Sequence, residues 1–323
     1  MIFNSLPQDF SSLQEPLIYT LSTQEQEPQD LLIEICSAES GQVLATKQLY
    51  AVSEAEVDIA PLLRECIIPT LPTESLGTGF LDCGCNVSVY LKVGDVQSAT
   101  RCFQWAKVEP STPLTMLSEQ TTNRAMAADE CDWIGVFSNG SKECNIHIET
   151  FGKECRKVDY RLPKAGQQLF VLVASEMGDC DQIEVEIVVD DALITKLYYD
   201  IKSNLRGARR VGWLNGNLSP EIYTFPMRKS LLIEATRRHL ERQWGRGAGQ
   251  VERDGELKLI SAYEPSTQLE TLAKIVHSSK VWLMRGCVRQ DVDLLTERVM
   301  LTPAERLGFI EIDIRAAKEG EEL

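Results

Sequence analysis

Residues 133–151 read WIGVFSNGSKECNIHIETF, two apolar segments on either side of a turn. The first segment, 133–137, is β-branched and aromatic, and the second alternates apolar and polar side chains over 146–151. Asn139-Gly140, which stands between them, is a dipeptide typical of a two-residue hairpin turn. The stretch therefore predicts a β-hairpin, and with it an all-β region in the middle of the chain.

Short strands of the same kind are predicted on both sides of this hairpin. They fall at 17–21, 31–36, 43–47, 56–59, 86–93, 100–105, 168–173, 183–189 and 192–199. One short helical turn is predicted over 58–64. Strands at this spacing, without amphipathic helices between them, favour antiparallel β-sandwiches of the immunoglobulin or fibronectin type, although the Cys-Trp-Cys signature of true immunoglobulin domains is absent.

The last third of the chain mixes strands with its clearest helix, predicted from Thr267 to His277. Thr267 and Glu270 have the spacing of a capping box. One helix face is apolar and carries Leu269, Leu272, Ala273 and Val276. Strands are predicted around it at 211–214, 222–225, 231–236, 257–263, 281–284 and 309–314. The strand aromatics are expected to form the core of this module: Trp213, Tyr223, Phe225 and Trp282. The pattern predicts an α+β module with one main helix.

The length of 323 residues exceeds what one compact core usually holds, which predicts two or three domains. The polar stretch 108–113 contains two prolines and is expected to be a linker, and a second break is expected near 200–206. We therefore expect a β-sandwich domain over 1–108, a second over 114–205 and an α+β domain over 206–323. The overall fold class is mainly β.

The composition and the amino-terminal sequence predict where in the cell the protein is located. The chain is 43% hydrophobic and 25% charged, as in ordinary soluble proteins, and no apolar run approaches the roughly 20 residues that cross a bilayer. The first residues lack the pattern of a signal peptide. These features predict a soluble protein that is cytoplasmic at synthesis, in which the ten cysteines are buried apolar residues and not disulfides.

Motifs for metal, cofactor or catalysis are missing from the sequence. Cys83-Gly84-Cys85 is one residue short of a zinc knuckle, and the three histidines form no HExxH frame. There is no GxSxG elbow, 245–249 lacks the residues of a phosphate-binding loop, and the acidic pairs near 179–181 and 190–191 begin no calcium loop. We expect no metal, no cofactor and no enzymatic activity.

Charge is distributed unevenly along the chain. The net charge is −15, but residues 1–205 carry −17, residues 206–323 carry +2, and 206–253 alone carries +6. Such polarity favours head-to-tail contacts between copies, although a basic run can also be a solvated hairpin face. One short basic patch in an acidic chain makes nucleic acid an unlikely partner. The candidate interaction surface consists of Arg209, Arg210, Arg237, Arg238, Arg242, Trp244 and Arg246.

Residues 210–226 read RVGWLNGNLSPEIYTFP. This segment resembles the "WLN, short turn, aromatic-T-F" hairpin of virion-associated, tail-like structural proteins from phages and prophages of gut bacteria. The order that follows is also similar: a long strand, a glycine-rich loop, the helix of 267–277, a strand over 280–283 and a closing strand over 309–314. Residues 13–23 resemble the first strand of those proteins. Here 218–221 replaces a glycine-rich turn, so the tip of the hairpin departs from the pattern.

The resemblance implies a role for the whole chain. It implies a non-enzymatic building block of a tail-like particle, located in the virion, that associates with copies of itself or with other tail components. The alternative is an adhesin-like β-sandwich protein that binds a carbohydrate or a peptide. That alternative requires exposed aromatic side chains in the first two domains.

Overall fold

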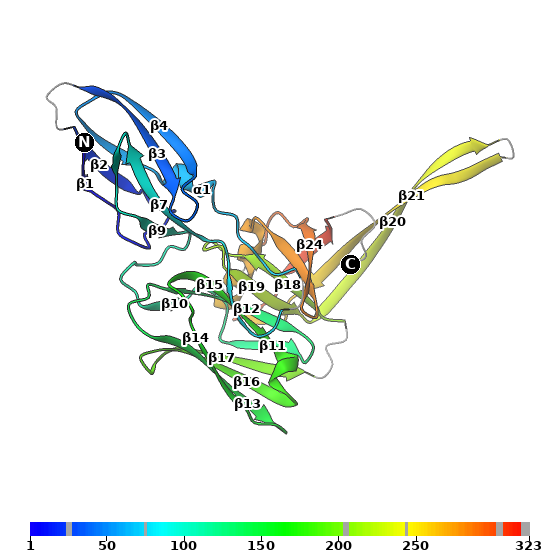
Figure 1. Ribbon diagram of the computed structural model, residues 1–323. Coiled ribbons are helices and arrows are strands. Elements are labelled where there is room, and N and C mark those ends of the chain that lie inside the picture. Colours follow the sequence, from blue (N-terminus) through cyan, green and yellow to red (C-terminus); the bar gives the residue numbers. More distant parts are fainter. Residues whose placement is uncertain (24–27, 74–75, 203–206, 243–244, 302–305, 318–323) are drawn as a thin grey trace.

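The computed structural model describes the chain except for residues 24–27, 74–75, 203–206, 243–244, 302–305 and 318–323, and of 233–254 it describes the backbone alone. The described part is mainly β and is built of several antiparallel sheets, which confirms the expected fold class at that level (Figure 1). Its helices are short: α1 (Ala60–Arg64), α2 (Ser266–Ala273) and the 3-10 turns η1 (Ala174–Met177) and η2 (Lys274–His277). None of these helices has the length and apolar character that crossing a membrane requires.

The N-terminal body consists of two facing sheets. One has the order β1-β2-β5, from Ile2–Ser5, Ile18–Ser22 and Glu54–Asp58. The other has the order β4-β3-β7-β8, with β9 also paired to β7, from Val43–Val52, Gln29–Ser37, Asn86–Val93, Val96–Gln97 and Arg101–Gln104. Tyr19, Ile33, Leu91 and Phe103 are among the side chains buried between them. The alternating strands predicted here are confirmed, and so is the short helical turn, which is α1.

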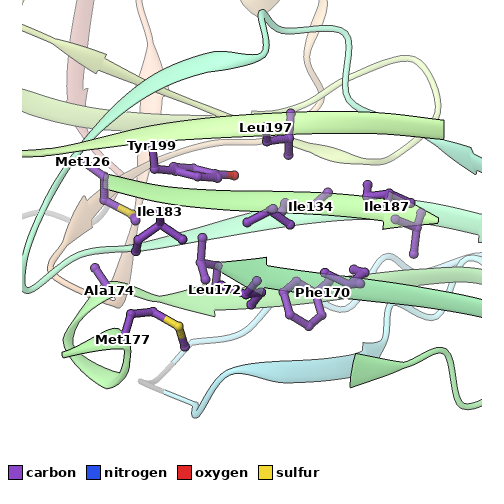
Figure 2. Close-up of a cluster of buried hydrophobic side chains, with 14 of the residues drawn as sticks. Met126, Ile134, Phe170, Leu172, Ala174, Met177, Ile183, Ile187, Leu197 and Tyr199 are labelled. Atoms are coloured by element: carbon purple, nitrogen blue, oxygen red, sulfur yellow. The ribbon is translucent and has the colours of Figure 1, made fainter. Parts of the chain in front are cut away.

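The middle body also pairs two sheets. The four-stranded sheet has the order β10-β12-β15-β6, from Leu114–Met116, Cys131–Ser138, Gly166–Val173 and Gly79–Asp82. The five-stranded sheet has the order β11-β17-β16-β13-β14, from Asn123–Ala127, Ala192–Lys202, Cys180–Val189, Cys144–Gly152 and Lys157–Arg161. Within it, β11 and β17 run parallel. Figure 2 shows the core between the sheets, where Ile134, Phe170 and Leu172 face Ile183 and Leu197.

The hairpin predicted around Asn139-Gly140 is wrong in its pairing. Strand β12 pairs with β10 and β15, whereas β13 pairs with β14 and β16, so the two strands that flank the turn lie in different sheets. Both edges of each strand are occupied by other partners. The dipeptide does supply the left-handed backbone that a tight reversal needs, with φ of 71° at Gly140, but a turn residue does not determine which strand pairs with which.

The C-terminal body is a seven-stranded sheet. Its order is β19-β18-β23-β24-β26-β21-β20, from Pro220–Phe225, Arg209–Leu214, Val281–Arg285, Val288–Leu294, Glu311–Ala316, Gly245–Ile260 and Met227–Arg242. Its two edge strands, β19 and β20, are separated in sequence by Pro226 alone. The sheet therefore curves, so that the end of β19 lies next to the start of β20. Leu269, Leu272 and Ile275 from α2 and η2 pack into the core. The short pair β22 (Glu264–Pro265) and β25 (Leu307–Gly308) lies beside α2.

The helix predicted from Thr267 to His277 is found as α2 followed by η2, but the capping box does not form. The helix begins one residue earlier, at Ser266, with Pro265 at the N-cap and no side-chain hydrogen bond to a free backbone N–H. Pro265 already holds an extended backbone, with ψ of 153°, directly before the first turn. A proline at this point can fix the start of a helix through its restricted φ, without a hydroxyl cap.

The four-stranded sheet of the middle body is covered on both faces. Every residue of β12 and β15 is buried, because one face meets the five-stranded sheet and the other meets the C-terminal body. The rings of Trp133 and Trp282 stack across this second interface, with their centroids 5.7 Å apart. Strand β6, from within residues 1–108, pairs with β15. The three segments expected as domains are therefore tied together through one central sheet.

Candidate functional site

Arg210 is not part of an outward-facing surface, which corrects the sequence-based expectation. It is 2% exposed, and its guanidinium group donates hydrogen bonds to Asp132 Oδ1, the Ala125 carbonyl and Thr224 Oγ1, each at 3.0 Å. Arg210 lies on β18 and Asp132 on β12, so the contact joins the C-terminal body to the middle one. The guanidinium group of Arg210 is therefore part of an internal interface.

Most of the other residues of the predicted basic surface belong to a projecting hairpin. We call the pair β20 and β21 the arm; its strands are 16 residues long and extend away from the rest of the molecule (Figure 1). The backbone of Arg237, Arg238, Arg242 and Arg246 belongs to the arm, but their side chains lie outside the described part, as does Trp244 entirely. Arg209 is half-buried at the start of β18. Burial, together with the charges of Arg228 and Arg285, lowers the pKa of Arg209.

A cluster of buried charges lies where the middle and C-terminal bodies meet. Asp132 Oδ2 accepts hydrogen bonds from Arg124 and from the Tyr199 hydroxyl, both at 2.7 Å, while its other oxygen accepts the bond from Arg210. Burial by itself would raise the pKa of Asp132, but the two guanidinium charges and these bonds hold it below the ordinary value. The carboxylate is therefore ionised and fully bonded without access to water.

Glu221 forms a second buried centre beside this cluster. Its carboxylate accepts hydrogen bonds from the Ser118 hydroxyl, the Glu119 backbone N–H and the Asn215 side-chain amide, each at 2.7 Å. Burial raises the pKa of Glu221, against the opposing effects of Arg124 and these donors. Both carboxylate side chains are almost completely buried. Their hydrogen bonds join residues of the middle body to residues of the C-terminal body.

The tip of the β18–β19 hairpin is where all three bodies touch. The Gly216 carbonyl accepts hydrogen bonds from the side-chain amide of Gln14 at 3.0 Å and from the indole of Trp105 at 3.1 Å. The next residue, Asn217, accepts one bond from the Lys107 backbone N–H and another from Gln167 of the middle body. The tip of this hairpin thus has an internal structural role.

The aromatic residues of this hairpin are core residues. Trp213 and Phe225 lie in the C-terminal core, as predicted, and Tyr223 donates a hydrogen bond to Glu264 at 2.8 Å. Trp282, in contrast, lies in the interface core against Trp133. It lies over Gly212, where an added Cβ would be 2.3 Å from the indole ring. Sequence reasoning found these residues but not the interface that one of them forms.

A crevice opens between the middle and C-terminal bodies. It has a volume of about 330 Å³, and its lining includes Gln120, Asn123, Tyr223, Glu264 and Gln268. A second hollow, of about 520 Å³, shares Asn123, Arg124 and Asp200 with it and lies over β11, β16 and β17. Sequence reasoning did not predict either of them, because their residues come from segments far apart in the chain.

All ten cysteines lie within the described residues as thiols, and six of them are buried. Cys83 and Cys85 lie in the interface core. Within the described residues, no group of three or more His, Cys, Asp or Glu side chains is placed to hold a metal ion.

The comparisons with known proteins assign no family. No family model matches the chain, and no curated protein matches it. Among similar solved structures are the Salmonella enterica SafA pilin in complex with the SafB chaperone and a Salmonella alpha-2-macroglobulin. The first is 12% identical, with 62% of this chain and 97% of that chain covered. The second is 9% identical, with 80% of this chain but only 23% of that chain covered. Both have a TM-score of 0.22, too low to infer a shared fold or function.

Proposed function

We propose that the chain is a non-enzymatic structural component of a phage-tail-like particle, which associates with copies of itself or with other particle proteins through its β-sandwich surfaces and its basic arm. The arm is the observation that supports this proposal most directly. Within the part of the chain that the structure describes, β21 pairs with β26 over Glu256 to Ile260 only, so residues 233–242 and 245–255 form a two-stranded ribbon without a third strand. An isolated two-stranded ribbon is marginally stable in water and gains stability when it packs against a partner.

Charge supports the same proposal. Residues 206–253, which include most of the arm, carry +6, whereas residues 1–205 carry −17. A basic projection on an acidic body fits head-to-tail contacts between copies, because opposite charges set the orientation of an encounter. Such heterologous contacts build rings or filaments. Arg210 contributes one of these positive charges to an internal ion pair, but the arm, 227–260, still carries eight Lys or Arg against five Asp or Glu.

A shortened arm tests the association. Residues 233–255 are replaced by Asn-Gly, which joins Leu232 to Glu256, two residues that face each other across the arm. The part of β21 that pairs with β26 is kept. We expect the wild-type chain to form oligomers at about 20 mM salt that dissociate at about 500 mM, because the Debye length falls severalfold over that range, and we expect the shortened chain to be monomeric throughout. Light scattering after size exclusion gives the masses.

A matched charge change separates the arm from net charge in general. Arg237→Glu with Arg238→Glu lies in the arm, and Lys157→Glu with Arg161→Glu makes the same change on β14. We expect the first pair to abolish the oligomers and the second to leave them. A wild-type chain that is monomeric at low salt and high concentration would overturn the proposed association.

The particle itself is tested by genomic context. If the proposal holds, the neighbouring genes include those for tail proteins, a tape measure and lysis proteins. A gene that stands alone among metabolic genes would contradict it.

A further inference from the structure

The outer face of the five-stranded sheet carries the hollow of about 520 Å³ described above. Its lining consists of Asn123, Arg124, Asp181, Gln182, Tyr198 and Asp200. This volume lies within the range of roughly 300–1,000 Å³ that is typical of small-ligand sites. Arg124 is turned inward to Asp132, so the remaining lining groups are two carboxylates, two amides and a phenol ring.

Strand register explains why these groups gather at one place. Across β13, β16 and β17, Phe151 faces Gln182, and Gln182 faces Asp200. In the neighbouring row, Tyr198 faces Asn123 of β11. Residues that face each other on one side of a sheet have Cβ atoms about 5 Å apart. The five side chains therefore form one continuous surface, which we call the platform: Phe151, Gln182, Asp200, Tyr198 and Asn123. The ring of Tyr198 lines the hollow, and the exposed Phe151 lies next to it in the sheet, opposite Gln182.

Three of the polar side chains that line this hollow are not used by the fold. In the part of the chain that the structure describes, the side chains of Asn123, Asp181 and Gln182 make no hydrogen bond to other residues. Asp200 is bonded to Lys202 alone, and the Tyr198 ring carries the Lys196 ammonium at 5.4 Å. This contrasts with Asp132 and Glu221, whose carboxylates are fully bonded.

We propose that this hollow binds a neutral saccharide unit of a glycan. Side-chain amides both donate and accept hydrogen bonds and carboxylates accept two or more, a combination that fits adjacent hydroxyl groups on a sugar ring. The flat face of Tyr198 or Phe151 fits the apolar C–H face of the same ring. Asp181 and Asp200 disfavour phosphate, sulfate and other anions at this position. The proposal is independent of the arm and of any self-association.

The test uses the full-length chain and a panel of neutral oligosaccharides: glucans, mannans, xylans and galactans. Binding is detected by saturation-transfer NMR and quantified by calorimetry. We expect at least one neutral class to bind, and we expect Tyr198→Ala and Gln182→Ala each to weaken it tenfold or more. Tyr50→Ala is the matched control, because Tyr50 is a strongly exposed tyrosine on β4 of the N-terminal body, outside this hollow. It is expected to bind as the wild type does.

Thermal melts of every variant show whether the fold is kept, and Asp200→Asn provides a second variant if Tyr198→Ala unfolds. Absence of binding across the panel at millimolar concentration would overturn the proposal. So would equal affinity for the wild type and the platform variants, or an equal loss in Tyr50→Ala. Binding of lysine-rich peptides without any neutral sugar would show a cation site and would equally overturn it.

Discussion

Asp132 is held between two buried guanidinium groups, Arg124 and Arg210, and removal of its charge is expected to be costly. In Asp132→Asn the two arginines keep their charges without the buried carboxylate that neutralises them. We expect the free energy of unfolding to fall by about 3–5 kcal/mol, as is typical when one partner of a buried ion pair is removed. Urea denaturation measures the change. Asp159→Asn is the control, since that carboxylate is largely exposed and pairs with His147 at the surface; a loss of more than about 1 kcal/mol there would contradict this reasoning.

The same carboxylate predicts a dependence on pH. The pKa of Asp132 is lower in the folded chain than in the unfolded one, so its contribution to stability is complete above the unfolded value of about 3.9 and is lost as the pH falls below it. We therefore expect the stability difference between wild type and Asp132→Asn to be constant from pH 7 to 5 and to shrink below about pH 4. Denaturation curves at several pH values test this. A difference that shrinks between pH 7 and 5 would show that another group controls it.

Residue-level reasoning from the sequence failed at Arg210 for a physical reason. Its neighbours in sequence are basic, which suggested an exposed patch, but the group that neutralises it is Asp132, 78 residues away. Nothing in the local sequence marks that partner. Trp213 and Phe225 were predicted as core residues correctly, because large aromatic side chains in short strands are more often buried than exposed.

At the scale of elements, strand β18 carries a glycine where its neighbour carries a tryptophan. Gly212 and Trp282 face each other across β18 and β23, and the indole occupies the space that a Cβ would need. We expect Gly212→Ala to lower the free energy of unfolding by about 1–3 kcal/mol through overpacking. Gly216→Ala is the matched control in the same hairpin, because no atom lies within 4 Å of its added Cβ. Equal melting temperatures for the two variants would contradict the prediction.

The positions of the strands could be predicted from the sequence better than the strands with which each one pairs. The alternation over 183–189 correctly gave β16, since one of its faces is buried and the other is not. The uninterrupted apolar run at 133–137 correctly gave a strand, but its burial on two faces follows from a body that begins near residue 209. Strand β6 was missed because its four residues, Gly79–Asp82, are too few to show a period. The hollow on the outer face of the five-stranded sheet could not be predicted, because register brings its lining residues together from three strands.

At the scale of the whole molecule, the stacked pair Trp133 and Trp282 couples the middle and C-terminal bodies. We expect Trp133→Leu and Trp282→Leu each to lower the temperature of one shared unfolding transition, with a coupling energy of about 0.5–1.5 kcal/mol in the double variant. Calorimetry measures the transitions. Trp133→Leu combined with Tyr50→Ala should be additive, because those sites are far apart in the fold. Two separate transitions, of which a variant moves only one, would show that the bodies unfold independently.

The burial of β12 and β15 on both faces has a consequence for synthesis. A nascent chain that has emerged as far as residue 173 already contains both strands. Two strands of the sheet that covers one face, β16 and β17, and the strands of the C-terminal body that cover the other, β18, β19 and β23, have still to follow. Until they arrive, one face of this apolar sheet is exposed to water and the other is covered only in part. Slow translation or early termination between residues 173 and 285 is therefore expected to release aggregating fragments, and a chaperone that shields this interval is expected to raise the yield of folded chain.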